Sequence, residues 1–309
     1  MVSVIIPTYN RAHTIGETLN SLIAQVYQDW ECIIIDDGST DQTVALMSHY
    51  VEKDSRFRFY PRPDAVSKGP NSCRNYGFTK VRGEFSLWLD SDDLLMPNAL
   101  HNIVPNFKDD TDAVISKVSF TDLATGKFLK SSVISSNNLI ADYLTGNVSF
   151  YISGPVWRRS YLEHKTLFDP LLSNLDDWDF NLRRIYENPR LVYLEEATVK
   201  YRIHPDSLSQ EIGKANQIEI SSEFRARNRH LQILKDRDKA NFKVLLEFTF
   251  ERYKYLLREA LLKKQPARHW LFANYARMLS KHKRYFALTK AGAAFFSMSV
   301  FKKGYKLLS

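Results

Sequence analysis

Closely spaced carboxylates follow an apolar run in the first third of the chain. Asp90-Ser91-Asp92-Asp93 comes directly after residues 85–89 (FSLWL), a run typical of a buried strand. Carboxylates at alternate positions bring their oxygens toward one point, and an oxygen-only ligand set suits Mg²⁺ or Mn²⁺, which take further ligands from water and phosphates. The same residues also fit a solvated turn that caps the helix after Met96-Pro97. The segment alone leaves both interpretations open.

A second carboxylate segment, Asp36-Asp37-Gly38-Ser39, ends the apolar run at residues 30–35. A carboxylate at that place can accept hydrogen bonds from the ribose or base of a nucleotide, and it can equally form a turn and a helix cap. Arg74 begins a helix-like stretch after Lys68-Gly69-Pro70, where a guanidinium could grip a phosphate with two hydrogen bonds. The alternative for Arg74 is an ordinary surface arginine.

A third acidic segment, Asp176-Asp177-Trp178-Asp179, opens a predicted helix. The helix dipole stabilises carboxylates in a first helical turn, so the pattern has a purely structural explanation. The neighbouring tryptophan favours a catalytic role instead, because this large residue often lines sugar-binding clefts. His204 ends the extended segment Tyr201-Arg202-Ile203-His204 and is either a ligand or a structural histidine.

Most of these polar segments follow strands of a predicted parallel sheet. Apolar runs occur at residues 2–7, 30–35, 57–60 and 85–89. Segments with helical periodicity lie between them: one at 15–26, one that starts after a cap at Thr40 or Asp41, and one at 71–81. This alternation predicts βαβ units. Thr8-Tyr9-Asn10 and the first two Asp segments then lie at the carboxyl ends of strands, the edge where open α/β sheets bind ligands.

The rest of the chain consists of an irregular part and a helical part. Between about 107 and 210 we predict a strand at 113–120, a hairpin around Gly126, a helix at 176–187 and an extended segment at 192–202. From residue 216 the periodicity is helical, with one apolar stripe formed by Leu246, Phe250, Tyr253, Leu257 and Leu261.

Composition and charge limit the class of protein. A hydrophobic fraction of 44% over 309 residues suits a globular protein, and Cys32 and Cys73, without CxxC spacing, suggest neither disulfides nor a zinc site. We see no secretory leader and no apolar window of the ~20 residues that span a bilayer, so we expect a cytoplasmic protein in a reducing compartment. Residues 216–309 carry 21 Lys/Arg and 7 Asp/Glu, a net of +14, against −6 for residues 1–215. A basic part of this kind suits nucleic acid or an anionic membrane surface.

Several enzyme classes are disfavoured because their motifs are absent. The sequence has no GxxxxGK[ST] phosphate loop, no GxGxxG fingerprint and no GxSxG elbow, which argues against kinases, P-loop ATPases, ordinary dehydrogenases and α/β-hydrolases. Two alternatives stay open. One is a nucleotidyltransferase acting on sugar phosphates, although IIPTYNRAHT lacks the glycine- and lysine-bearing loop normal for that class. The other is an inactive module that binds nucleotides, other anions or membranes.

Seven segments share their order and spacing with a known family: VSVIIPTYNR, WECIIIDDGSTD, NSCRNYG, FSLWLDSDDLLMP, GPVWRRS, LDDWDFNLR and YRIHPDSLS. They resemble family 2 of the inverting glycosyltransferases with a GT-A fold, over roughly residues 1–210. The resemblance implies an α/β domain at 1–215, with a mostly parallel sheet flanked by helices, a nucleotide-binding part (1–106) and an acceptor-side part (107–215). A basic helical region follows at 216–309.

The activity implied by the resemblance is sugar transfer from a nucleotide-sugar donor, typically a UDP-sugar, with hexosyl or N-acetylhexosaminyl groups expected. The acceptor is a hydroxyl of a saccharide or a lipid-linked saccharide, and the expected process is cell-surface polysaccharide synthesis. Within the donor site, the resemblance places Pro7 and Tyr9 along the nucleoside pocket and Asp37 on the base. It places Arg74 nearby or at the diphosphate, and Asp90 near the ribose or the metal.

For the chemistry, the resemblance makes Asp92 a ligand of the Mn²⁺ or Mg²⁺ that bridges the diphosphate, and it lets His204 reach the metal or the diphosphate. Asp177, the second residue of the family's acidic pair, is the expected general base. A carboxylate that takes the proton of the acceptor typically contributes about 10²–10⁴-fold. A divalent cation neutralises the leaving diphosphate, and attack from the opposite face inverts the anomeric configuration.

Three positions depart from the family pattern. Cys73 stands where alanine is usual, and Asp176 stands where the acidic pair usually begins with glutamate. Leu167-Phe168-Asp169-Pro170 replaces a glycine-rich turn, so the acceptor-side loop is not predicted.

The tail beyond residue 216 lies outside the resemblance. Basic residues flank an uncharged stretch at 291–301 that is too short to span a bilayer but long enough to lie in its interface. We therefore expect a peripheral anchor on the inner, anionic face of the cell membrane, with packing inside the protein or in a dimer as the alternative. No nucleic-acid-binding signature is visible, so we expect no nucleic-acid partner. The basic residues are Lys281, Lys283, Arg284, Lys302, Lys303 and Lys306, and the apolar ones include Phe295, Phe296, Met298, Val300 and Phe301.

Overall fold

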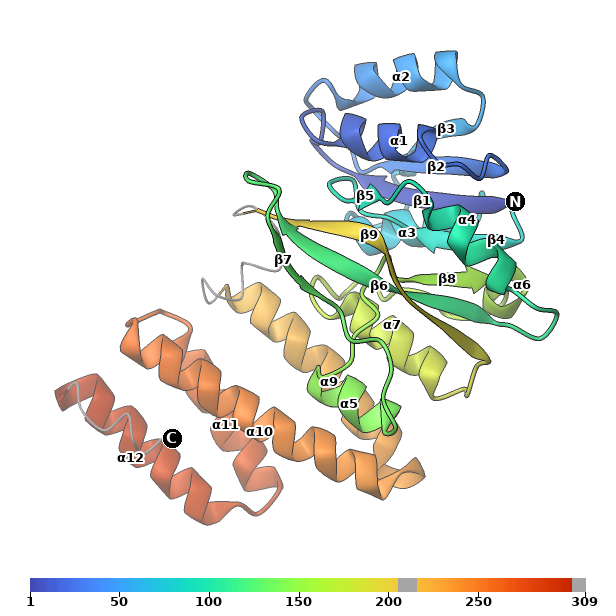
Figure 1. Cartoon of the computed structure of the whole chain (residues 1–309). Coiled ribbons are helices and arrows are strands. Elements are labelled where there is room, and N and C mark those ends of the chain that lie inside the picture. Colours follow the sequence, from blue (N-terminus) through green and yellow to red (C-terminus); the bar gives the residue numbers. More distant parts are fainter. Residues whose placement is uncertain (205–215, 302–309) are drawn as a thin grey trace. The chain divides into compact units, whose positions relative to one another are not determined.

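The structure is a computed structural model that describes residues 1–204 and 216–301 (Figure 1). The chain forms two compact units, Met1–Pro205 and Asp206–Ser309. The boundary expected after residue 215 stays a prediction, because residues 205–215 lie outside the described residues.

A mixed sheet forms the centre of the first unit. Its strand order within the described residues is β3-β2-β1-β4-β8-β6-β9-β5, and β7 pairs with β6. The strands β1 to β4 run parallel to one another where they pair, and so do β6 and β9, whereas β5, β7 and β8 pair antiparallel. The strands are β1 (Val2–Thr8), β2 (Trp30–Asp36), β3 (Phe57–Pro61), β4 (Phe85–Trp88), β5 (Leu94–Leu95), β6 (Ala113–Asp122), β7 (Phe128–Ser131), β8 (Pro155–Arg158) and β9 (Leu191–Ile203).

Helices pack on the sheet because its central strands are apolar on both faces. Along β1, Val4 and Ile6 belong to a buried cluster with Ile15 and Leu19 of α1. Ile5 points to the other face, where a Cβ on Gly77 of α3 would lie 2.5 Å from its side chain, so α3 needs a glycine there. The helices of this unit are α1 (Ile15–Ile23), α2 (Thr43–Lys53), α3 (Pro70–Phe78), α4 (Ala99–Ile103), the short 3-10 turn η1 (Val104–Asn106), α5 (Leu139–Thr145), α6 (Arg159–Leu162) and α7 (Asp176–Ile185).

The predicted fold class is confirmed, with corrections at the ends of elements. The helix expected over 15–26 ends at Ile23, and the helix expected over 71–81 ends at Phe78. The second helix begins at Thr43 after Gln42, and neither Thr40 nor Asp41 occupies the cap position. Asp41 still contributes there, because its Oδ1 accepts a hydrogen bond of 2.9 Å from the backbone N–H of Thr43.

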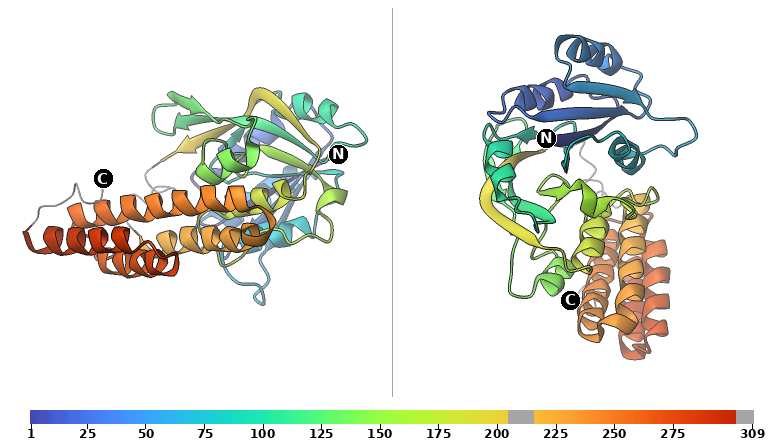
Figure 2. Two further views of the ribbon diagram at one scale, coloured as in Figure 1. Left: turned by 90° about the horizontal axis from the view of Figure 1, so that it is seen from below. Right: turned by 90° about the vertical axis from the view of Figure 1, so that its right-hand side faces the viewer.

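The second unit consists of helices that run beside one another (Figure 2). Every residue of the predicted apolar stripe on α10 is buried, which explains why that helix lies inside the bundle. Within residues 1–204 and 216–301, no helix combines the length and apolarity that a membrane crossing requires. The helices are α9 (Gln217–Arg237), α10 (Lys239–Leu262), α11 (Arg268–Lys281) and α12 (Tyr285–Phe301).

Candidate active site

Four strands end at one edge of the sheet and deliver the candidate residues there. Strands β2, β1 and β4 are parallel neighbours, so the segments after Thr8, Asp36 and Trp88 emerge on the same side. Two antiparallel steps, from β4 to β8 and from β8 to β6, restore the direction, and β9 runs parallel to β6. His204, which directly follows β9, therefore reaches the edge that carries Asp90 and Asp92.

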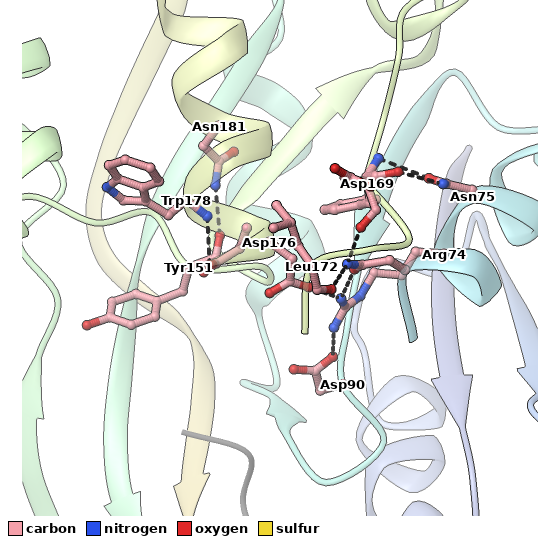
Figure 3. Close-up of polar contacts among 12 residues, drawn as sticks. Arg74, Asn75, Asp90, Tyr151, Asp169, Leu172, Asp176, Trp178 and Asn181 are labelled. Carbon is pink, nitrogen blue, oxygen red and sulfur yellow. Dashed lines mark hydrogen bonds and ion pairs between the residues drawn. The ribbon is translucent and has the colours of Figure 1, made fainter. Parts of the chain in front are cut away.

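Arg74 lies at the centre of a buried polar cluster (Figure 3). Its Nη2 donates to Asp90 Oδ1 at 2.8 Å, and its Nη1 donates to Asp176 Oδ2 at 2.6 Å and to Asn71 Oδ1 at 2.8 Å. The Arg74 side chain is only 7% exposed, so this arginine is not an ordinary surface residue. Burial lowers its pKa, but the carboxylates of Asp90 and Asp176 outweigh burial and raise the pKa above its usual value.

The expected base, Asp177, lies beside that cluster in the first turn of α7. Burial raises the pKa of the Asp177 carboxyl to about 7, and the charge of the adjacent Asp176 adds to the rise. Its Oδ1 accepts a hydrogen bond of 2.7 Å from the backbone N–H of Trp178. Leu175, which precedes the helix, has a left-handed φ of 59°. Such strain in a residue with a side chain is typical of functional sites, where the surroundings hold the backbone in place.

Asp92 and His204 are 112 positions apart in the sequence but lie close together in the structure. Asp92 Oδ2 lies 3.1 Å from His204 Nε2 and 3.8 Å from Arg11 Nη2. Among the described residues, no group of three or more His, Cys, Asp or Glu side chains forms a ready metal site. The Asp92 carboxylate still fits Mn²⁺ or Mg²⁺ held by few protein ligands, because these ions take the remaining ligands from substrate phosphates and water. Of the two ions, the transition metal Mn²⁺ accepts a neighbouring imidazole nitrogen more readily.

Asp37 is anchored by the loop that leads into α3. Arg62 Nε donates to Asp37 Oδ1, and the backbone N–H of Gly69 donates to Asp37 Oδ2 at 2.8 Å. Gly69 has a φ of 126°, a conformation that side chains rarely adopt, so glycine is required at this contact. Asp37 thus fixes the loop between β3 and α3, and its assignment to the base of the donor stays a prediction.

Pro7 and Tyr9, the other predicted nucleoside contacts, occupy different surroundings. Pro7 is buried within β1 between β2 and β4, whereas Tyr9 follows the strand with half of its surface exposed. The loop after Tyr9 is tied to the loop after β2, because the backbone N–H of Thr40 donates to Asn10 Oδ1 at 2.8 Å.

Two asparagines of α3 bind the acceptor-side loop, which the sequence left unpredicted, and Figure 3 shows one of them, Asn75. Asn75 exchanges two hydrogen bonds with the backbone of Phe168, at 2.8 and 3.0 Å. Asn71 Nδ2 donates to the carbonyl oxygens of Asp169 and Leu172, at 3.0 and 2.7 Å. Asn75 uses both its oxygen and its NH₂ group on the loop, and Asn71 uses its NH₂ group there, so α3 fixes the chain that leads into α7.

Three contributors to this site were missed by sequence reasoning. Arg62 lies in a segment without a periodic pattern, whereas Asn71 and Asn75 lie in NSCRNYG, within the helix predicted over 71–81. Their spacing of four places both on one helical face, as i and i+4 residues are, and this was the available signal. Arg62 offered none, because its partner Asp37 lies 25 residues away in the chain.

Comparison with solved structures identifies the fold. The chain superimposes on residues 1–349 of Staphylococcus aureus TarS in complex with UDP-GlcNAc with a TM-score of 0.66 at 21% identity, covering 99% of this chain and 89% of that one. A Pyrobaculum calidifontis mannosyltransferase in complex with GDP-Man and Mn²⁺ gives a TM-score of 0.58 at 18% identity, covering 99% and 84%. The fold is thus that of the GT-A nucleotide-sugar transferases.

Sequence comparisons identify the family. The pattern of glycosyl transferase family 2 matches residues 3–165, more than half of the chain, and the chain belongs to that family. A putative glycosyltransferase of Bacillus subtilis, EpsH, is 29% identical over 222 residues, which are 69% of this chain and 64% of that protein. An uncharacterized glycosyltransferase of Haemophilus influenzae is 35% identical over 100 residues, 32% of this chain and 39% of that protein. The chain therefore spans less than two thirds of the length of either relative.

Proposed function

We propose that this glycosyltransferase is a metal-dependent, inverting enzyme that moves a hexosyl or N-acetylhexosaminyl group from a UDP-sugar to a hydroxyl of a saccharide or lipid-linked saccharide. The observation that carries the proposal is the Asp177 carboxyl at the start of α7, whose pKa burial raises to about 7. A base with a pKa near the working pH both accepts a proton readily and is ionised in a large fraction of molecules.

In the proposed mechanism Asp177 accepts the proton of the acceptor hydroxyl while that oxygen attacks the anomeric carbon. The attack comes from the face opposite the diphosphate, so the configuration inverts. Asp92 and His204 are the residues that would hold a divalent cation, and such a cation when bound would neutralise charge on the departing diphosphate. Asp37, Pro7 and Tyr9 bind the nucleoside in this scheme, and Asp90 orients the donor near the metal.

The choice of UDP as the donor nucleotide rests on similarity to solved structures, and an activity assay with different nucleotide sugars tests it first. TarS was solved in complex with UDP-GlcNAc, whereas the Pyrobaculum protein was solved in complex with GDP-Man. We expect UDP-sugars, in the presence of Mn²⁺ or Mg²⁺, to be hydrolysed slowly or transferred to saccharide acceptors. The product's anomeric proton coupling in NMR then reports the stereochemistry. A product that keeps the configuration of the donor, or activity confined to sugar-phosphate nucleotidyl transfer, would contradict the proposal.

The lipid-linked acceptor is supported by one face of α12, a helix that lies within the described residues up to Phe301. Ala291, Ala294 and Met298 face the bundle and are buried. The opposite face is apolar as well, because Phe286 and Phe296 are 80% and 61% exposed. We define the outward face of α12 as Phe286, Ala293, Phe296, Val300 and Phe301, which recur at helical spacing.

Positive charge lies before the start of that helix and on it. Lys281, Lys283 and Arg284 precede α12, and Lys290 lies on it, whereas Lys302, Lys303 and Lys306 lie outside the described residues. Exposed aromatic side chains next to basic ones suit an anionic bilayer surface, where each basic residue contributes about 1 kcal/mol. Phe295 fits the alternative of packing inside the protein, because its ring stacks on that of Phe272 with the ring centroids 4.4 Å apart.

Vesicle co-sedimentation of the full chain tests the anchor. We expect binding to vesicles rich in phosphatidylglycerol at low salt, weaker binding as salt screens the charges, and little binding to phosphatidylcholine vesicles. Replacing Phe286 and Phe296 by serine should release the protein. A matched control replaces the exposed pair Phe128 and Leu129 of β7 by serine and should leave binding unchanged. Equal release by both variants, or no pelleting of the wild type at low salt, would rule the anchor out.

A further inference from the structure

The site contains a link between its two functional halves that the proposed roles do not use. Asp90 belongs to the donor side, at the end of β4, and Asp176 belongs to the acceptor side, as the first residue of α7. They are 86 positions apart in the sequence, yet one guanidinium touches both carboxylates, at 2.8 and 2.6 Å. Arg74 is the only described side chain that hydrogen-bonds to both.

The position of Arg74 is itself fixed. Its side chain is 7% exposed, and Asn71, one helical turn earlier on α3, accepts a third hydrogen bond from it at 2.8 Å. The same Asn71 holds the loop at Asp169 and Leu172 that leads into α7. Helix α3 therefore grips both the start of α7 and the chain before it.

We propose that Arg74 is a positioning residue for Asp177, which it places against the donor side by holding the neighbouring Asp176 to Asp90. The inference rests on the proposed role of Asp177 as the base. It differs from a direct contact of Arg74 with the diphosphate, because the guanidinium already meets three protein acceptors. Rotation of the first turn of α7 would move the base, and a shift of about 1 Å in a reacting group can cost on the order of 10²-fold in rate.

Two substitutions separate position from charge. Arg74→Lys keeps the positive charge but offers a point donor that cannot reproduce the planar, two-sided contact. Asp176→Asn keeps an oxygen that can accept from Arg74 while removing the ion pair. We expect each to lower kcat by roughly 10- to 100-fold while the Kd for UDP with Mn²⁺ stays within about threefold of wild type. Arg190→Lys, at an arginine that is 68% exposed and pairs with Asp110 at the surface, is the matched control and should keep wild-type kcat.

The double variant decides whether the two residues act together. If Arg74 works through Asp176, the double variant should be about as slow as the slower single one, because both substitutions weaken the same contact. Three results would overturn the inference. They are a double variant whose loss of kcat is the product of the two single losses, a wild-type kcat in Arg74→Lys, and a tenfold weaker Kd for UDP without a larger loss of kcat. Thermal unfolding identifies a variant that does not fold, and Asp176→Asn then carries the test through its own kcat and Kd.

The proposed function is tested in the same set by Asp177→Asn. If Asp177→Asn keeps wild-type turnover, the assignment of the base fails. If Asp177→Asn is inactive while Arg74→Lys matches wild type, the base stands and the positioning role alone fails.

Discussion

The Asp177 carboxyl lies in surroundings that oppose its charge. Burial and the neighbouring Asp176 both raise its pKa, to about 7, while Arg74 lowers it. Near neutral pH the group is therefore balanced between a protonated form that the fold prefers and an ionised form that the proposed chemistry needs. Function and stability make opposite demands on this one residue.

The pH dependence of the proposed reaction follows from that balance. The base is competent only when ionised, so kcat/KM should fall about tenfold per pH unit below pH 7 and level off above it. Initial rates with saturating Mn²⁺ between pH 5.5 and 8.5 provide the measurement. A flat profile down to pH 5.5 would show that a carboxyl of ordinary pKa, or none, serves as the base.

Asp177→Asn should remove activity and increase stability together. We expect turnover to fall by about 10²–10⁴-fold with UDP binding close to normal, because only the proton acceptor is lost. Asparagine retains an oxygen for the N–H of Trp178. Calorimetry for UDP and initial rates at pH 8 check this part, and wild-type turnover would direct attention to Asp176 or Asp179.

The stability change has a defined sign. The folded pKa of Asp177 lies above its unfolded value, so the folded state loses stability as the pH rises from about 4 to 7 and carries the full cost above pH 7. Asparagine carries no such cost. The variant should be about 4 kcal/mol more stable than wild type at pH 8, roughly 8–16 °C in Tm, with the difference vanishing near pH 4. A pH-independent difference would mean that charge is not the cause.

Between elements, α3 and the loop before α7 form the connection on which the acceptor side depends. Asn75→Ala removes two hydrogen bonds to Phe168 and leaves backbone groups of that residue without a partner. We expect a loss of about 1–3 kcal/mol in the free energy of unfolding, measured by urea denaturation. Asn106→Ala, which removes one hydrogen bond within the segment at the end of α4, is a comparison that should cost less. Equal losses of stability in the two variants would show that the contact of Asn75 with the loop contributes no more than an ordinary side-chain hydrogen bond.

The predicted elements are those with strong local patterns. Strands β1 and β2 are apolar runs of β-branched residues, and α10 shows its buried stripe directly in the sequence. Strand β5, with two residues, and β8, with four, are too short to carry any periodicity. They form because neighbouring strands pair with them, and a local sequence pattern does not predict pairing between residues far apart in the chain.

The same distinction applies to the site. Proximity of Asp90, Asp92 and the end of β1 follows from parallel strands, so the sequence predicts it. The contacts of Arg74 with Asp176 and of Asp92 with His204 span more than 100 residues each. The resemblance to a family pointed toward the second through a shared metal, and no prediction covered the first. The hydrogen bond of Arg74 to Asp176 depends on the orientation of α3 against α7, which no spacing within either helix determines.

At the scale of the whole molecule, donor and metal should stabilise the first unit together. We expect UDP with Mn²⁺ at about 100 times its Kd to add about 2.7 kcal/mol to the stability of the folded state. Asp92→Ala should lose at least about tenfold of the Mn²⁺-dependent gain in UDP affinity, because one of two proposed protein ligands is missing. Thermal shift and calorimetry with and without Mn²⁺ measure both effects, and an identical metal dependence in the variant would exclude Asp92 as a ligand.

The place of β9 in the sheet determines the order in which parts of the first unit can fold during synthesis on the ribosome. Strand β9 lies between β6 and β5, and Arg202, near its end, donates from its backbone to Asp93 at 3.0 Å. About eighty residues separate the end of β6 from the end of β9, which at ordinary elongation speeds means roughly 4–16 s. During that interval a nascent chain holds the β9-pairing edge of β6 uncovered, a template for unwanted strand pairing. The donor side can therefore form early, but the position that brings His204 to Asp92 exists only after nearly the whole first unit has left the ribosome.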